Sequence, residues 1–210
     1  MITVPRLYAI IDPALLNDGS VSGISGFLRE LIAGGATLIQ LRAKRENPGE
    51  ILSQAREMRR IAGAFPEHGI RLIMNDRADL CLASDFDGVH VGQDDLSPES
   101  ARRIVGKQRW VGISTHNPEQ VQTADQGDAD YIAIGPIFQT RSKREPDPVV
   151  GLEGIRTARD LTKKPLVAIG GLDLENCRSA IDAGANAIAV ISSLLEHPQK
   201  RTEEFLRKLE

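Results

Sequence analysis

Eight short runs of apolar residues, many of them β-branched, recur along the chain, and nearly all of them end in a polar or glycine-containing cluster. Runs of this length and composition, bounded in this way, are typical of buried β-strands. We therefore predict eight strands. They cover residues 6–12, 37–42, 71–76, 88–93, 110–115, 131–138, 165–171 and 187–193.

The segments between these runs carry start signals for helices. A capping residue precedes a proline at Asn47-Pro48, Ser97-Pro98 and Asn117-Pro118, and proline is favoured at the first position of a helix. Glu50 and Gln120 lie three residues after Asn47 and Asn117, so we predict capping boxes at two of these helices. Strand and helix thus alternate along the chain.

Such alternation predicts an α/β fold in which right-handed βαβ units build a parallel sheet covered by helices. Eight units of roughly 26 residues each predict one closed (β/α)8 TIM barrel, a single domain over residues 1–210. The alternative is a doubly wound open sheet, which more often has about five or six strands and one GxGxxG turn. The sequence contains no such turn, which favours the barrel.

The composition changes this picture little. The 210 residues carry a formal charge of −3, from 26 basic and 29 acidic side chains, so no overall field favours nucleic acid or an anionic membrane. We expect small-molecule ligands instead. Cys81 and Cys177 form no CxxC pair, which indicates buried thiols in a reducing compartment. With no signal peptide and no apolar run of membrane length, we expect a cytoplasmic protein, and a homo-oligomer is compatible with the sequence.

The barrel prediction locates the chemistry, because active sites of this fold lie at the carboxyl ends of the strands and in the loops after them. After the second strand, Gln40 and Arg42 share one face, Lys44 can extend the row, and Leu41 points toward the helices. An arginine on the inner face of a barrel requires an anionic partner. An internal ion pair with an aspartate and a binding site for an anion are equally open interpretations.

Two carboxylates follow neighbouring strands, Asp76 after the third and Asp95 after the fourth. Such a pair suits Mg²⁺, which takes one or two carboxylates together with waters and phosphate oxygens of a substrate. The alternative is that Asp76 caps the next helix and that Asp95 belongs to the turn before Ser97-Pro98. For either residue alone, this alternative would be the better interpretation.

The end of the fifth strand, Ser114-Thr115-His116, shows no Ser-His-Asp pattern and no nucleophile elbow. This argues against hydrolysis through a protein nucleophile. Neither His90 nor His116 is assigned a role, since isolated histidines more often pack or form hydrogen bonds than bind ligands.

Pairs of small residues, Gly170-Gly171 and Ser192-Ser193, end the seventh and eighth strands. TIM barrels commonly bind a phosphate in these two loops, through backbone N–H groups and a helix N-terminus. Tight turns and a serine helix cap are the alternative. Because both pairs lie at the expected strand ends, we predict a phosphate site.

The loop after the sixth strand, residues 138–150, is too long to be a simple turn. Loops of this length in a compact protein are usually functional or disordered. Thr140, Ser142 and Lys143 would offer donors to a second anion across the barrel mouth. A solvated charged loop without a ligand is the alternative.

Eight motifs, in one order over nearly the whole chain, match a known family. They are QLRAK (40–44), ND (75–76), GVHVGQDD (88–95), GISTH (112–116), GPIFQTRSK (135–143), VGLEG (150–154), AIGG (168–171) and ISS (191–193). In these motifs the chain resembles thiamine phosphate synthases. The resemblance implies a transferase that joins a hydroxymethylpyrimidine diphosphate to a thiazole phosphate with Mg²⁺, giving thiamine phosphate and pyrophosphate.

The resemblance also implies roles for individual residues. Arg42, Lys143 and Ser114 would act in catalysis, and Asp76 and Asp95 would bind the metal. The substrate contacts it implies are Gln40, Arg42, Lys44, Asn75, Ser114, Thr140, Ser142, Lys143, Gly171, Ile191 and Ser192. Two positions differ from the family pattern. Ala43 replaces a common acid on the face away from Arg42, and Ser142 replaces threonine but keeps the hydroxyl.

Other functions fit the sequence less well. The related thiazole tautomerases carry a histidine just after the sixth strand, where this chain has Gly135-Pro136. An aldolase or sugar phosphate isomerase would use a strand-end base, and the sixth strand has no lysine on its inner face. A non-catalytic sensor of thiamine phosphates would have no need for Asp76, Asp95 and Lys143, which suit a metal-assisted leaving group.

Overall fold

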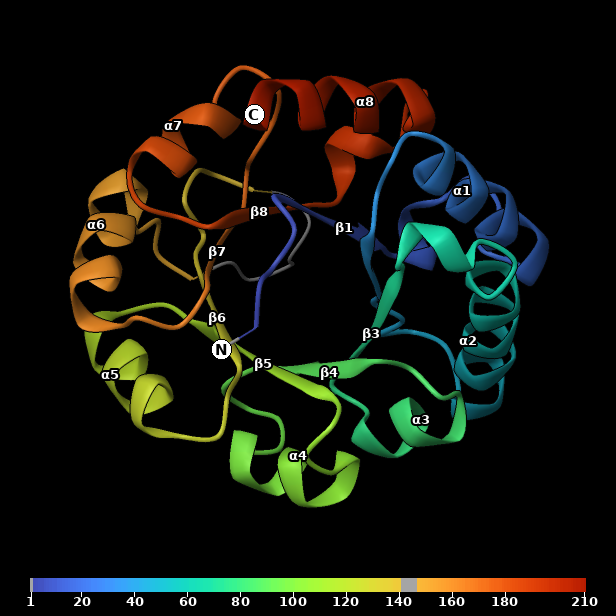
Figure 1. Cartoon of the computed structure of the whole chain (residues 1–210), viewed down its shortest axis with the longest axis horizontal. Coiled ribbons are helices and arrows are strands. Elements are labelled where there is room, and N and C mark those ends of the chain that lie inside the picture. Colours follow the sequence, from blue (N-terminus) through green and yellow to red (C-terminus); the bar gives the residue numbers. More distant parts are fainter. Residues whose placement is uncertain (1, 141–146) are drawn as a thin grey trace.

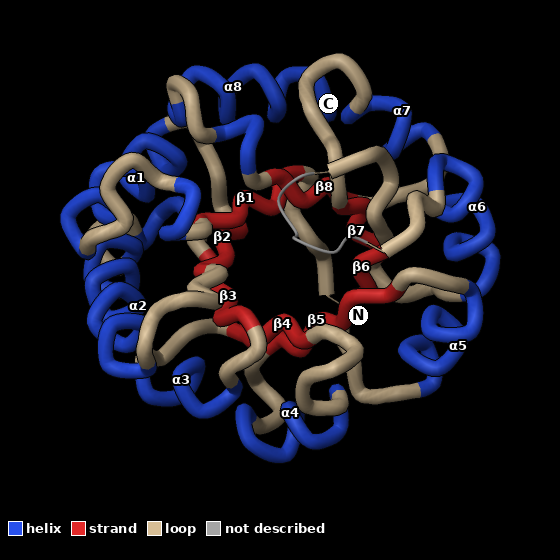
Figure 2. The backbone as a smooth tube through the Cα atoms, turned by 180° about the vertical axis from the view of Figure 1, so that it is seen from behind, coloured by secondary structure: helices blue, strands red, loops and turns tan. Residues whose placement is uncertain are grey.

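The computed structural model describes residues 2–140 and 147–210. Eight parallel strands form a closed barrel in sequence order, in which each strand pairs with the next and β8 pairs with β1. The helices form an outer ring around the strands in Figure 1, and Figure 2 shows the same two rings from the opposite side. The predicted (β/α)8 barrel is confirmed, and the open sheet is excluded.

The strands lie within the predicted runs, whose polar ends mostly extend beyond the paired residues. They are β1 (Leu7–Ile11), β2 (Leu38–Leu41), β3 (Arg71–Asn75), β4 (Gly88–Val91), β5 (Trp110–Thr115), β6 (Tyr131–Ile134), β7 (Leu166–Ile169) and β8 (Ala187–Val190). The polar ends of the runs therefore stand at the rim of the barrel, where a ligand can reach them.

Eight α-helices and three short 3-10 helices occupy the described part of the chain. The α-helices are α1 (Val21–Ala33), α2 (Pro48–Ala62), α3 (Ala78–Ala83), α4 (Pro98–Val105), α5 (Pro118–Gln126), α6 (Gly151–Leu161), α7 (Cys177–Asp182) and α8 (Pro198–Leu209). The 3-10 helices are η1 (Pro13–Leu15), η2 (Pro66–His68) and η3 (Ser192–Leu194). None of the helices in residues 2–140 and 147–210 combines the length and apolar character needed to cross a membrane.

One of the two predicted capping boxes is present. At α2, Asn47 accepts from the Glu50 backbone N–H while the Glu50 carboxylate accepts from the Asn47 N–H, each at 3.1 Å. At α5, Asn117 accepts from the Gln120 N–H, but the Gln120 side chain accepts from the His116 N–H at 2.7 Å. The second box is therefore wrong, because Gln120 bonds one residue further back and ties the end of β5 to the helix.

Two apolar layers follow from the alternation of side chains along the strands. In β1, Leu7, Ala9 and Ile11 pack against the helices, whereas Tyr8 and Ile10 belong to a separate cluster inside the barrel. In β2, Leu41 likewise faces the helix layer, as predicted. The barrel is thus filled by its own side chains, and polar residues on the inner faces must find partners there.

Both cysteines are free and buried, as the sequence predicted. Burial raises the pKa of the Cys81 thiol to about 12, and it also raises the pKa of Cys177. Because the thiolate is the reactive form, these buried thiols are poor nucleophiles at neutral pH.

Candidate active site

Arg42 lies just beyond β2, where its backbone N–H donates to the Ile11 carbonyl at 2.8 Å. Its guanidinium forms an ion pair with the Asp12 carboxylate, whose other oxygen accepts from the Ala14 N–H at 3.1 Å. Asp12 is 6% exposed, so the pair is largely shielded from water. Of the two interpretations of Arg42, an internal ion pair or an anion site, the ion pair is present. It fixes the guanidinium at the barrel rim through a charge-assisted hydrogen bond.

Lys44, Asp76 and Asp95 converge on the rim after β2, β3 and β4. The Lys44 Nζ lies 3.0 Å from Oδ2 of Asp76. Burial is the main cause that raises the pKa of Asp76; Lys44 acts in the opposite direction, and the neighbouring Asp95 raises the pKa further. Asp95 itself accepts from the Gly92 backbone N–H at 2.9 Å. Two carboxylates and one ammonium therefore share a small volume.

The local backbone shows that Asp76 does not cap a helix. Helix α3 has Arg77 at its N-cap position and no side-chain cap hydrogen bond, so the capping alternative for Asp76 is wrong. Asp76 has a φ of 60°, a left-handed conformation that is uncommon for a residue with a side chain and often marks a functional site. For Asp95 the turn interpretation is correct in part, through its bond to Gly92.

The donor set fits Mg²⁺ rather than a softer metal. Two adjacent carboxylates raise each other's affinity for a cation, and Mg²⁺ binds through one or two carboxylates plus waters and phosphate oxygens. Within residues 2–140 and 147–210 no group of three His, Cys, Asp or Glu side chains is arranged to hold a metal. A metal at this site would therefore need oxygens from the substrate.

A chain of hydrogen bonds runs through the barrel interior between Gln40 and Ser114. The Gln40 Nε2 donates to the Tyr8 hydroxyl at 2.7 Å, and the hydroxyls of Tyr8 and Tyr131 are 3.0 Å apart. The Tyr131 hydroxyl lies 3.0 Å from His90 Nδ1, and His90 Nε2 lies 2.9 Å from Ser114 Oγ. Two residues predicted to contact substrate are thus connected through three buried side chains that the sequence had left without a role.

All three connecting groups are neutral at pH 7. Burial lowers the pKa of His90 to about 4, and burial raises the pKa values of Tyr8 and Tyr131 above their ordinary value. The alternation of side chains in the sequence could have placed Tyr8 and His90 inside the barrel. Tyr8 shares the inner face with Asp12, and His90 lies between two outward-facing valines in GVHVG. The partners themselves depend on contacts across the barrel, which no local pattern encodes.

The glycines after β7 allow the loop after β6 to pack closely against the end of β7. Gly170 and Gly171 have φ values of 99° and 64°, and a Cβ on Gly171 would lie 2.4 Å from the Gln139 carbonyl oxygen. The Phe138 N–H donates to the Gly170 carbonyl at 3.0 Å. Glycine is therefore required here by backbone conformation and by space, whether or not the turn also binds a phosphate.

After β8, Ser192 begins η3 and is exposed, and Ile191 packs against the apolar cluster inside the barrel. The Ser193 hydroxyl donates to the Leu172 carbonyl at 3.0 Å, which joins the β7 and β8 ends. The serine-cap alternative is wrong for η3, which has no side-chain cap hydrogen bond. The assignment of Gly171, Ile191 and Ser192 to a phosphate site stays a prediction.

The loop after β6 is closed at its base. The Val150 N–H donates to the Pro136 carbonyl at 2.9 Å, and the Nδ1 of His116 donates to the Gly135 carbonyl at 2.6 Å. His116 Nε2 lies 3.5 Å from the Asp147 carboxylate. His116 therefore fastens the ends of β5 and β6 to the returning chain.

Of the remaining predicted substrate contacts, two belong to the described residues and two do not. Asn75 ends β3 at half-buried depth, in register with His90 of β4. Thr140 is described and has an interaction partner. Ser142 and Lys143 lie outside the described residues.

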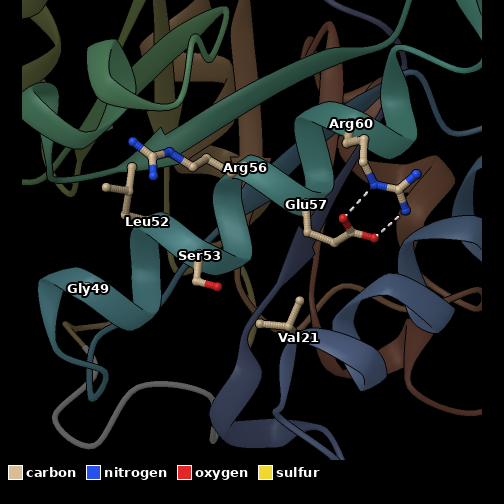
Figure 3. A pocket seen from close by; sticks show the side chains of 7 residues that line it. All are labelled: Val21, Gly49, Leu52, Ser53, Arg56, Glu57 and Arg60. Atoms are coloured by element: carbon tan, nitrogen blue, oxygen red, sulfur yellow. Dashed lines mark hydrogen bonds and ion pairs between the residues drawn. The ribbon is translucent and has the colours of Figure 1, made fainter.

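A surface groove of about 390 Å³ lies away from these strand ends, between α1 and α2. Figure 3 shows its lining, in which the Arg60 guanidinium donates two hydrogen bonds to the Glu57 carboxylate and Val21 faces them from α1. The groove is open and contains none of the candidate residues. We do not assign the chemistry to it.

The barrel rim thus combines a fixed arginine, a lysine beside two carboxylates, and hydrogen-bonding groups set into the interior. This arrangement is typical of (β/α)8-barrel proteins that bind phosphorylated small molecules at the carboxyl ends of their strands. The family model for thiamine monophosphate synthase matches residues 7–194, and the chain belongs to this family.

Individual relatives resemble the chain over nearly its full length. It is 56% identical over 207 residues to the thiamine-phosphate synthase of Koribacter versatilis, which covers 98% of this chain and 96% of that protein. It is 42% identical over 191 residues to the enzyme of the same name from Halalkalibacterium halodurans, covering 90% and 87% of the two chains. The solved structure of thiamine phosphate pyrophosphorylase from Pyrococcus furiosus superimposes with a TM-score of 0.84 at 32% identity, covering 97% and 95%.

Proposed function

We propose that the chain is a transferase that forms thiamine phosphate and pyrophosphate from a hydroxymethylpyrimidine diphosphate and a thiazole phosphate. The family match over residues 7–194 supports this activity. The observation that carries it is the convergence of Lys44, Asp76 and Asp95, since a diphosphate leaving group requires both cationic groups and metal-binding carboxylates.

Diphosphate binding is assigned to the side of the barrel at β2 to β4. Arg42, held by Asp12, and Lys44, beside Asp76, carry the positive charge there. Mg²⁺ bound by Asp76 and Asp95 would neutralise charge that develops on the departing pyrophosphate. Thr140, and Ser142 and Lys143 outside the described residues, would contact the same leaving group. Gln40 and Ser114, which end a row of neutral hydrogen-bonding side chains, are assigned to the pyrimidine, and Asn75 to the diphosphate or the pyrimidine. Gly171, Ile191 and Ser192 are assigned to the thiazole phosphate.

The proposed reaction is a dissociative displacement. The bond between the pyrimidine methylene carbon and the diphosphate oxygen breaks, and its electron pair leaves on pyrophosphate. The carbocation is stabilised by the pyrimidine ring, and the lone pair of the thiazole nitrogen then forms the new C–N bond. The Arg42 guanidinium, already fixed by Asp12, would lower the barrier as a preorganised cationic group that needs no rearrangement while the charge grows. No protein nucleophile is needed.

Competing activities have less support. The position just after β6 holds Gly135-Pro136 in place of a tautomerase histidine, and the comparisons give no support to a sensor. The inner face of β6 carries Tyr131 and Ala133, neither of which is an aldolase lysine. The two buried free thiols support a reducing compartment, and we propose the cytoplasm, with a homo-oligomer as a compatible state.

The test is pyrophosphate release from the purified protein, measured with each substrate alone and with both together, in the presence and absence of Mg²⁺. The proposal expects release and thiamine phosphate formation only with both substrates and the metal. Binding of the thiazole phosphate without turnover under any condition would overturn it in favour of a tautomerase or a sensor.

A further inference from the structure

We propose that Tyr8, Tyr131 and His90 are positioning residues that set the hydrogen-bond polarity of the site. Through them, Ser114 is held as a donor toward the ligand and the Gln40 carbonyl as an acceptor. The proposal deepens the proposed function, because the ligand of Gln40 and Ser114 is there the pyrimidine. It rests on contacts described above and on the number of protons that each group carries.

The proton count fixes the order of donors and acceptors. The Tyr8 oxygen accepts from the Gln40 Nε2, and among the described residues the Tyr131 oxygen is the one acceptor within reach of the single Tyr8 proton, which therefore goes there. The single Tyr131 proton then goes to His90 Nδ1, which leaves the proton of the neutral imidazole on Nε2. That proton is donated to Ser114 Oγ. The protons of Tyr8, Tyr131 and His90 are all used in this order, as buried polar groups require.

The two ends of the row therefore have opposite hydrogen-bonding roles toward a ligand: Ser114 is a donor, and the Gln40 Oε1 is an acceptor. Among the described residues, the Ser114 hydroxyl proton has no acceptor, and the Gln40 Oε1 has no donor. A ligand that contacts both must offer an acceptor to Ser114 and a donor to Gln40. The ring nitrogen and exocyclic amino group of an aminopyrimidine are such a pair, whereas an oxopyrimidine presents the opposite pattern.

The barrel holds these groups in place by packing. The Tyr131 ring stacks on His90 with centroids 5.5 Å apart and packs edge-on against Tyr8 at 6.0 Å. Gly112 provides the space, because a Cβ at that position would lie 2.1 Å from the Tyr131 ring. Both tyrosines are about 1% exposed or less, so water cannot easily replace their hydroxyl partners.

The first experiment reads the proton order directly in the wild-type protein, without any assay of turnover. The ¹⁵N shifts of His90 near pH 7, assigned by comparison with His90→Gln, should show a neutral ring with the proton on Nε2. A proton on Nδ1 would reverse every bond in the row, make Ser114 an acceptor, and overturn the proposal. This result does not depend on the proposed activity.

The second experiment measures steady-state kinetics of Tyr131→Phe, which removes the donor to His90 Nδ1 and keeps the ring. We expect the KM for the pyrimidine diphosphate to rise about tenfold, the effect of roughly one hydrogen bond, with little change in the KM for the thiazole phosphate. The His90 tautomer should become mixed. In a Ser114→Ala background, Tyr131→Phe should have a smaller further effect on KM, because only the Gln40 end of the row then remains to be disturbed.

Thr115→Val provides the matched control, since Thr115 lies in the same strand and its buried hydroxyl donates to the Ala133 carbonyl at 2.8 Å outside the row. Its KM values should not change. Equal losses in Tyr131→Phe and Thr115→Val, or a fully additive double variant, would show a structural role only and overturn the proposal. If the wild type forms no thiamine phosphate, the proposed function fails while the tautomer measurement still decides the proton order.

Discussion

The ammonium group of Lys44 lies 3.0 Å from Oδ2 of Asp76, on the carboxylate that we assign to the metal. Asp95 stands beside the same carboxylate and raises its pKa, whereas Lys44 acts in the opposite direction. Burial is the main cause that raises the pKa of Asp76, and these two neighbours shift that pKa further in opposite directions. A cation that replaces or joins Lys44 at this point would keep both carboxylates ionised.

Asp76→Asn should weaken the dependence on Mg²⁺. The amide keeps the shape of the side chain but loses the charge, so half-maximal activity should require at least about ten times more Mg²⁺. The measurement is a Mg²⁺ titration of pyrophosphate release. Asp79→Asn is the matched control, because Asp79 lies on the same segment and its carboxylate forms an ion pair with Arg77 at the surface. An unchanged titration in Asp76→Asn would remove Asp76 from the metal site.

Lys44→Met should raise the pKa of Asp76. Lys44 favours the ionised carboxylate, so its removal leaves burial and Asp95 to act alone, and a higher pH is then needed to deprotonate Asp76. The pKa can be followed by ¹³C NMR of the carboxyl carbon in metal-free protein. No movement, or a fall, would mean that the Lys44–Asp76 contact does not persist in solution.

Arg42→Ala should lower kcat by about 30- to 900-fold, the equivalent of roughly 2–4 kcal/mol of transition-state stabilisation. The same change leaves Asp12 buried without its partner, so the free energy of unfolding should fall as well.

The double variant Asp12→Asn with Arg42→Ala separates these two effects. Removal of the buried charge should restore most of the stability, as measured by urea unfolding, but none of the activity. Recovery of turnover in the double variant would contradict a catalytic role for the guanidinium and leave Arg42 with a structural role only.

Gly171→Ala should destabilise the protein by about 1–3 kcal/mol, because the new Cβ adds strain at a positive φ and meets the Gln139 carbonyl. It should also raise the KM for the thiazole phosphate. Gly26→Ala is the control: Gly26 lies in α1 with nothing within 4 Å of the new Cβ, so alanine should be neutral or stabilising there. Equal stability of the two variants would show that the turn after β7 can relax.

The sequence predicted the parts of the molecule that depend on local patterns. Period-two alternation placed Gln40 inside the barrel and Leu41 outside, and the structure agrees. Prolines after capping residues marked the starts of α2, α4 and α5. These features follow from neighbouring residues alone.

The parts that the sequence did not predict depend on which strands meet across the barrel. Asp12 was not identified as the partner of Arg42, and the hydrogen-bond row through Tyr8, Tyr131 and His90 joins five different strands. At the start of α5, the position of Gln120 fitted a capping box, but its side-chain oxygen accepts from the His116 N–H instead of the Asn117 N–H. Distances between residues remote in sequence decide such contacts.

The hydrogen bond between the Val150 N–H and the Pro136 carbonyl joins the chain that leaves β6 to the chain that enters α6. Because these two ends are bonded to each other, the end of β6 and the start of α6 keep their places at the rim whatever the length of the loop between them. The entropic cost of a longer loop grows slowly, by only about 0.6 kcal/mol for each doubling of its length. This chain could therefore exchange the segment for one of another length and acquire a different ligand without rebuilding its barrel.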